Sequence, residues 1–188
     1  GQSEFVECIS GMRKDYKGHV SILGQCVDKL NIKKIRKAGL SHISEDRMSY
    51  GVATEASISD NLISDKLGES MVGCGPILSS KKISKLSSEL VENFLIKCSS
   101  YKQPVSMLSG GNMQKVVVAR EFAREPAVMI ANQPSRGVDV GATEFIHKKL
   151  VEIRDKGSAV LLVSADLNEV MELSDSLAVF YGGEVVAY

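Results

Sequence analysis

The segment Leu108–Lys115, with the sequence LSGGNMQK, contains the residues best suited to bind an anion. Gly110 and Gly111 allow a phosphate to approach backbone N–H groups closely, and the dipole of a helix that begins here favours negative charge. Ser109 adds a hydroxyl donor. The alternative for the serine and the two glycines alone is an ordinary helix start with Ser109 as its N-cap. We call Leu108–Lys115 the glycine segment, and it is a candidate phosphate site.

The segment Ala127–Ala142, AVMIANQPSRGVDVGA, follows one helix later and has the pattern of a buried strand that breaks at Pro134. Many phosphate-handling folds use this layout to aim carboxylates at a magnesium ion. Here the two residues before the proline are the amides Asn132 and Gln133. The strand thus keeps the frame of such a site without its charge.

The elements that position these two segments alternate between strands and helices, which favours an α/β fold with a mainly parallel sheet covered on both faces. A helix that stops before Pro126 connects the glycine segment to the apolar strand. Further strands are predicted at residues 40–43 and 158–164, and a two-strand hairpin at 176–188 turns on Gly182 and Gly183.

A second part of the chain, rich in serine and lysine, predicts a small helical subdomain. Its clearest element is a helix over residues 81–98, preceded by a glycine-rich break at 71–76. The expected organisation is a partial core at 1–50, the helical subdomain at 51–107, and a C-terminal core at 108–188.

Composition excludes several classes of function. Lysine plus arginine, at 23, balance aspartate plus glutamate, at 23, so no bulk charge attracts nucleic acid, and we expect no nucleic-acid partner. No apolar run approaches the roughly 20 residues that cross a bilayer. The four cysteines form no C-x-x-C pair and the three histidines share no ligand-like spacing, so we expect reduced thiols and assign no metal site.

The two segments together resemble motifs of the ATP-binding-cassette ATPases. LSGGNMQK resembles the family's signature motif, and AVMIANQPSRGVDVGA resembles its Walker B strand and D-loop in the variant found in importers of simple sugars and nucleosides. GLSHISEDR resembles the Q-loop region, VSADLNEV the switch region, and GQSE the last residues of a Walker A loop, so the similarity covers nearly the whole chain.

This resemblance implies a RecA-like parallel sheet whose N-terminal strands and most of whose phosphate loop are missing from a fragment. Within the family the chain is most similar to the second cassette of a two-cassette polypeptide, nearest to the branch that takes up nucleosides through a lipoprotein receptor.

The resemblance also assigns roles to single residues. The nucleotide-binding positions are those of the Walker A end, the Q-loop, the signature motif and the D-loop: Gly1, Gln2, Ser3, Glu45, Leu108, Ser109, Gly110, Gly111, Asn112 and Asp139. Gln2 stands where the family has a phosphate-binding lysine. Glu45 stands at the Q-loop glutamine, and an acid there is unhelpful beside triphosphate unless a cation screens it.

Three further positions match catalytic residues of the family but lack their chemistry. Asn132 matches the aspartate that holds magnesium through water, Gln133 the glutamate that orients the attacking water, and Ala165 the switch histidine. Loss of a positioned base alone costs about 10²- to 10⁴-fold in rate. We therefore expect no catalytic residue and no metal ligand in this domain.

The expected function is that of an ATP-binding domain of an importer for nucleosides or simple sugars, whose signature motif completes a site on the first cassette. ATP binds weakly here or is only shared with that cassette, and Mg²⁺ accompanies it in the full-length protein. The expected partners are the first cassette, membrane permease subunits and, indirectly, a substrate-binding lipoprotein, at the cytoplasmic face of the bacterial plasma membrane. The alternatives are a hydrolytically active ATPase domain and a structural domain that binds no nucleotide.

Overall fold

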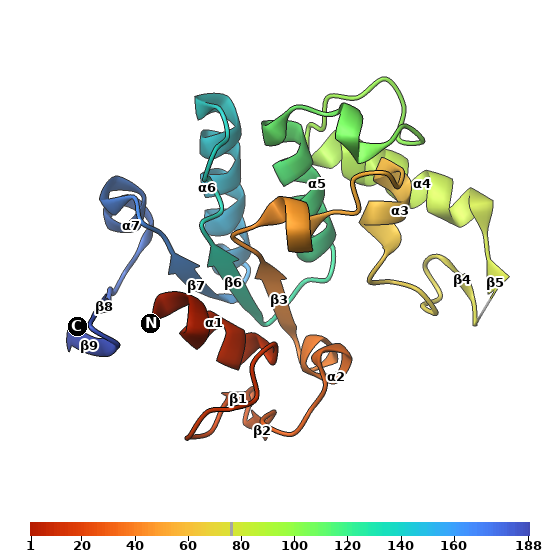
Figure 1. The fold of residues 1–188 in the computed structure, drawn as a ribbon. Helices are drawn as coiled ribbons and strands as arrows, with labels where there is room; N and C mark the ends of the chain where they lie inside the picture. The colour runs from red at the N-terminus through yellow and green to blue at the C-terminus, as the bar shows by residue number, and fades with distance from the viewer. Residues whose placement is uncertain (76) are drawn as a thin grey trace. The chain divides into compact units, whose positions relative to one another are not determined.

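The computed structural model describes residues 1–75 and 77–188 (Figure 1). The chain forms two compact units: unit 1 comprises residues 1–43, 125–134 and 147–188, and unit 2 comprises 44–124 and 135–146, apart from residue 76. Unit 2 includes the stretch expected to form a helical subdomain together with the glycine segment.

Unit 1 contains a three-stranded parallel sheet in the order β3-β6-β7. These strands are β3 (Leu40–Ile43), β6 (Val128–Asn132) and β7 (Ala159–Val163). Leu40 pairs with Val128, and Val128 in turn pairs with Ala159, so the three strands start level. This parallel α/β arrangement confirms the fold class expected from the alternation of strands and helices.

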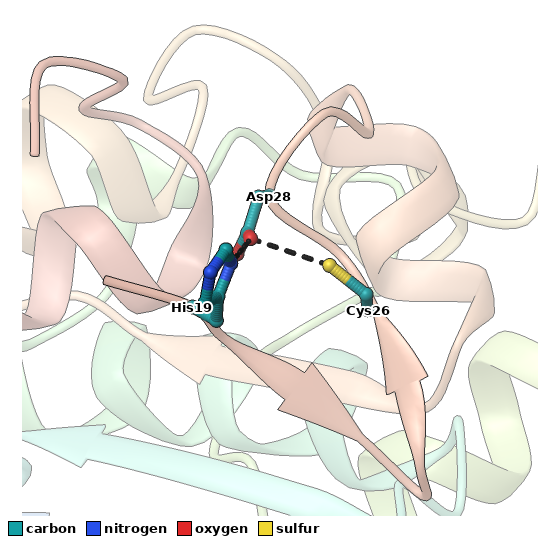
Figure 2. A group of neighbouring side chains, drawn as sticks. All are labelled: His19, Cys26 and Asp28. Carbon is teal, nitrogen blue, oxygen red and sulfur yellow. Dashed lines mark hydrogen bonds and ion pairs between the residues drawn. The ribbon is translucent and has the colours of Figure 1, made fainter. Parts of the chain in front are cut away.

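Two antiparallel hairpins accompany the sheet in unit 1. β1 (Ser21–Ile22) and β2 (Gln25–Cys26) form a short hairpin, whose ribbon is seen in Figure 2. The two residues between the strands, Leu23 and Gly24, both have positive φ. β8 (Val179–Tyr181) and β9 (Glu184–Ala187) are joined at two glycines, as predicted.

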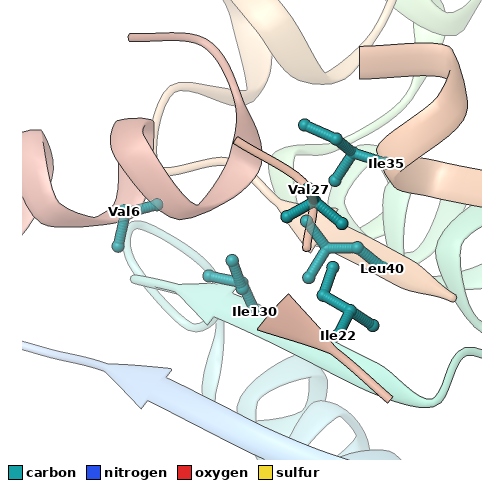
Figure 3. Close-up of a cluster of buried hydrophobic side chains, with 6 residues drawn as sticks. All are labelled: Val6, Ile22, Val27, Ile35, Leu40 and Ile130. Atoms are coloured by element: carbon teal, nitrogen blue, oxygen red, sulfur yellow. The ribbon is translucent and has the colours of Figure 1, made fainter. Parts of the chain in front are cut away.

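The hydrophobic core of unit 1 joins helix α1 (Gln2–Ser10) to one face of the sheet. Figure 3 shows its buried cluster, formed by Val6, Ile22, Val27, Ile35, Leu40 and Ile130. Side chains alternate between the two faces of a strand, so Met129 and Ala131 face away from Ile130, and both are fully buried too. β6 is therefore covered on both faces, as the central strand of a parallel sheet should be.

The remaining elements of unit 1 are α2 (Ile32–Lys37), α7 (Leu167–Leu173) and the end of α6 (Val140–Asp155), which begins in unit 2. Unit 2 contains a π-helical turn (Arg47–Gly51), α3 (Ile58–Ile63), β4 (Gly73–Cys74), β5 (Ile77–Leu78), α4 (Ser80–Asn93), a 3-10 turn (Val105–Met107) and α5 (Gly110–Phe122).

One helix ends earlier than its sequence pattern predicts. α4 stops at Asn93, not at residue 98, because Leu95 adopts a left-handed conformation with φ of 50° and points outward, 61% exposed. Phe94 and Ile96 on either side of it are buried. The apolar pattern continued through the turn because burial, and not helical periodicity, selects those two side chains. Among the described residues, no helix combines the length and apolar character needed to cross a membrane.

Candidate functional site

The glycine segment forms the start of α5 in unit 2. Ser109 is the N-cap, with extended backbone, and its Oγ accepts hydrogen bonds from the backbone N–H of Asn112 at 3.4 Å and from the Asn112 side chain at 2.9 Å. The capping role considered from sequence is therefore present. Ser109 is exposed, and its hydroxyl only accepts in these two bonds. The hydroxyl proton of Ser109 is therefore free to be donated to an anion.

The two glycines allow neighbouring groups to pack tightly against the helix start. A Cβ atom on Gly110 would lie 3.1 Å from Nη2 of Arg47, and one on Gly111 would lie 2.7 Å from Oδ2 of Asp139. Asp139 in turn accepts a hydrogen bond at Oδ1 from the backbone N–H of Ala142, at 2.9 Å, in the first turn of α6. The signature residues and Asp139, predicted separately, are thus brought together.

Arg47 connects this helix start to the loop that precedes α6. Its Nη1 donates to the backbone oxygen of Arg136 at 2.7 Å, and its Nη2 donates to that of Gly137 at 3.1 Å. The bond lengths suit the forked geometry of a guanidinium group, which can serve two acceptors at once. No sequence pattern indicated Arg47 as a site residue, although it lies within the segment that resembles the Q-loop region.

Glu45 lies in the same part of unit 2 and forms an ion pair with the guanidinium group of Arg136. This pairing supplies the cation that an acidic side chain near triphosphate requires. Both side chains are partly exposed, so the pair contributes little to stability, and its main effect is on the local charge. Arg136 was not among the residues predicted for the site.

Lys115, at the end of the glycine segment, does not face the helix start. Its Nζ lies 4.7 Å from the centre of the Phe145 ring and donates to the backbone oxygen of Leu95 at 3.2 Å. Burial lowers the pKa of Lys115, which the negative charge of Asp139 partly offsets. The cation therefore supports packing within unit 2.

The amide positions lie in unit 1, at the carboxyl ends of β6 and β7. Asn132 is buried, and Gln133 has a left-handed backbone with φ of 51°. The backbone N–H of Gln133 donates to the backbone oxygen of Val163 at 2.7 Å. The side-chain amide oxygen of Gln133 accepts from the backbone N–H of Ala165 at 3.3 Å. These bonds tie the ends of the two strands together without any ionised group.

The N-terminal positions are also in unit 1. Gly1 caps α1 without a side-chain bond, and Ser3 is exposed on the first turn of that helix. Gln2 and Phe5 line a cavity of about 630 Å³ along β7. The cavity lining is mainly apolar, with Leu161 among its side chains, so it does not suit a phosphate.

The site can therefore be described as two separate sets of groups. Unit 2 presents an exposed serine and first-turn N–H groups at the start of a 13-residue helix, beside Arg47 and Asp139. Such a helix start binds anions. Unit 1 presents Asn132 and Gln133, which provide neither the negative charge that Mg²⁺ requires nor a base. The residues present fit a bound phosphate in unit 2 and do not fit a magnesium ion at the strand ends in unit 1.

Comparison with protein families matches the chain to the family described as ABC transporter, over residues 1–136. Among curated proteins, the chain is 37% identical to the guanosine import ATP-binding protein NupO of Bacillus subtilis and 35% identical to the nucleoside import ATP-binding protein NupA of Lactococcus lactis. These alignments cover 100% and 98% of the chain and 37% of each relative. It is also 37% identical to the ribose import ATP-binding protein RbsA of Halalkalibacterium halodurans, with 99% of the chain and 37% of the relative covered.

Two solved structures of the cassette MJ0796 share the fold. The dimeric form from a bacterial ABC transporter superimposes with a TM-score of 0.82 at 20% identity, and the post-hydrolysis dimer bound to ADP and Pi with a TM-score of 0.80 at 21% identity. Both matches cover 100% of this chain and 79% of the cassette. The chain spans little more than a third of the length of the curated relatives.

Proposed function

Because the chain belongs to the ABC transporter family, we propose that it is an ATP-binding domain of an importer ATPase that contributes its signature segment to ATP held by a partner cassette and hydrolyses none at its own strand ends. The similarity to guanosine, nucleoside and ribose import proteins supports nucleosides or simple sugars as the solutes. ATP is the proposed ligand, with Mg²⁺ supplied at the partner's site.

The contrast between the two units is the observation that carries this proposal. In unit 2, Ser109 caps α5 with its hydroxyl exposed, and Gly111 leaves room for Asp139. In unit 1, Asn132 and Gln133 stand where a charged pair is needed. A chain that keeps the anion-binding helix start and lacks the carboxylates is suited to assist hydrolysis on another domain.

An active ATPase in which Gln133 positions the water is the competing function. This function rests on the fact that phosphoryl transfer depends mostly on positioning and electrostatic stabilisation. The amide oxygen of Gln133 already accepts a hydrogen bond from Ala165, however, and an amide cannot take a proton from water. These two facts favour the inactive domain.

The family membership also supports the proposed partners. The first cassette of the polypeptide would hold the nucleotide, and permease subunits would contact the π-helical turn, where Met48 is 53% and Tyr50 is 75% exposed. Exposed apolar side chains grouped on one turn favour a protein contact. A substrate-binding lipoprotein would deliver the solute to the permease, and the domain would lie on the cytoplasmic face of the membrane.

The test replaces Ser109 by arginine in the full two-cassette polypeptide, reconstituted with its permease. Arginine places bulk and charge where the hydroxyl meets phosphate, so we expect ATP turnover to fall by about 10²-fold, the cost of losing one donor to a developing negative charge. Ser88→Arg is the matched control, because Ser88 is exposed on α4 of the same unit. We expect it to leave turnover unchanged.

Two outcomes would count against the proposal. Unchanged turnover in Ser109→Arg would contradict the contribution to the partner's site. Steady turnover by a polypeptide whose first cassette has lost its phosphate-binding lysine would show that the strand ends of this chain are active.

A further inference from the structure

Three side chains around the hairpin β1–β2 direct metal-binding atoms toward one point. Figure 2 shows His19, Cys26 and Asp28 turned toward one another. Nδ1 of His19 lies 2.8 Å from Oδ2 of Asp28, and Sγ of Cys26 lies 3.2 Å from the same oxygen. One ligand atom from each of the three residues lies within 4.8 Å of the others. No part of the proposed ATP chemistry uses this cluster.

The carboxylate of Asp28 is held in place by groups on its other oxygen. Oδ1 accepts a hydrogen bond from the backbone N–H of Val20 at 2.6 Å and another from the Tyr16 hydroxyl at 3.1 Å. The side chain is only 18% exposed. Oδ2 is therefore oriented before any ligand arrives, which is the part that outer groups play around metal ligands.

The order of the three groups argues against a nucleophilic cysteine. In such a site the imidazole lies between the nucleophile and the carboxylate, so that it can take the proton and be oriented in turn. Here the thiol and the imidazole both bond to the carboxylate of Asp28. This arrangement activates no thiol, but it presents sulfur, nitrogen and oxygen to a shared position.

We propose that Nδ1 of His19, Sγ of Cys26 and Oδ2 of Asp28 bind a zinc ion, with water as the fourth ligand. Thiolate, imidazole and carboxylate are the ligands that zinc takes in proteins, and three protein ligands with one water form an open tetrahedral site. A thiolate ligand disfavours Mg²⁺ and Ca²⁺, so the site differs in chemistry from a nucleotide-bound magnesium.

The geometry requires only small movements. Around a tetrahedral zinc ion the nitrogen and oxygen ligands stand about 3.4 Å apart and the sulfur and oxygen ligands about 3.6 Å apart, as follows from the usual bond lengths. The separations of 2.8 and 3.2 Å must therefore open by about 0.6 and 0.4 Å, which requires an outward movement of the side chains. The side chain of His19 is 87% exposed and Cys26 is also exposed, so both can move outward.

Binding changes the protonation of one group. The thiol of Cys26 donates its proton to solvent as the zinc–sulfur bond forms, the imidazole binds through neutral Nδ1, and no electron is transferred. The bound ion links the residues before β1 to the residues after β2, so it fastens the hairpin at its open end.

The test titrates the full chain, tag-free, reduced and stripped of metal, with ZnCl₂ by calorimetry in the absence of nucleotide. We expect one ion per chain, and a thiolate-to-metal charge-transfer band when Co²⁺ replaces Zn²⁺. Cys26→Ser and His19→Gln should each weaken binding by at least 10-fold. Tyr16→Phe removes only a bond to Asp28 and should weaken it by about 10-fold, as other outer-group changes do.

Cys74→Ser is the matched control, since Cys74 is an exposed free cysteine in unit 2, and it should bind zinc like the wild type. Circular dichroism of each variant checks that the chain is folded. No binding by the wild type, or affinity unchanged in both Cys26→Ser and His19→Gln, would overturn the proposal. Because no ATP is present, neither result bears on the proposed function.

Discussion

Asp139 lies so close to Gly111 that a Cβ atom on the glycine would stand 2.7 Å from the Oδ2 atom of the aspartate. This contact joins the start of α5 to the start of α6 within unit 2. It explains the second glycine of the signature segment by close packing, since Gly111 is not among the residues with positive φ.

Replacing Gly111 by alanine should destabilise the chain. The new methyl group meets Asp139 and also approaches the Cβ of Ala142 at 3.1 Å, so overpacking of about 1–3 kcal/mol outweighs the gain of about 1 kcal/mol in helix propensity. Gly141→Ala is the control, because its Cβ would meet only Asp139, at 3.4 Å. Urea unfolding should show a lower midpoint for Gly111→Ala than for the wild type. The midpoint of Gly141→Ala should not be lowered. Equal midpoints in the two variants would contradict the packing argument.

Replacing Arg47 by lysine should loosen the loop before α6. Lysine keeps the charge but cannot serve the backbone oxygens of Arg136 and Gly137 at once. We expect a loss of about 1.5–3 kcal/mol in the free energy of unfolding, the range for hydrogen bonds to charged groups. Amide exchange should become faster in residues 136–139 and stay unchanged in β6. Unaltered exchange in that loop would show that the two bonds do not hold it.

Replacing His147 by leucine should lower the free energy of unfolding, because it leaves the buried carboxylate of Glu169 without its hydrogen-bond partner. The carboxylate of Glu169 is 2% exposed, and its Oε1 lies within hydrogen-bonding distance of Nε2 of His147, at 2.8 Å. The other carboxylate oxygen has no partner. Leaving the carboxylate without this bond should cost about 2 kcal/mol. Adding Glu169→Met to the His147→Leu variant should recover most of that loss in thermal unfolding. A double variant as unstable as the single one would show that packing, and not the polar pair, dominates.

Replacing Asp28 by asparagine should change how stability depends on pH. The backbone N–H of Val20, with help from the side chains of His19, Cys26 and Tyr16, lowers the pKa of Asp28 in the folded chain. A lowered folded pKa adds stability above the unfolded value of about 4, and this stability is lost as pH falls through the folded pKa. The advantage of the wild type over Asp28→Asn in metal-free urea unfolding should therefore shrink below about pH 4. A constant difference from pH 7 to pH 2 would contradict this.

Much of the local structure could be predicted from the sequence because its signals act over a few residues. Alternating apolar strands and helices gave the parallel sheet, and the serine and glycines gave the start of α5. The end of α4 was missed because burial of Phe94 and Ile96 on both sides of a left-handed Leu95 follows from packing, which a helical period does not record.

The amino-acid sequence sets the chemical nature of each position: amides at Asn132 and Gln133, a hydroxyl and two glycines at the start of α5, and a net charge of zero. Which of these positions come into contact depends on the fold. Arg47 binds backbone oxygens 89 and 90 residues further along, and the path of the chain around β1 and β2 brings His19 and Cys26 to Asp28. Residue type is set by covalent chemistry, whereas such meetings depend on how the whole chain packs, because contacts distant in sequence form only when burial of the core fixes the path between them.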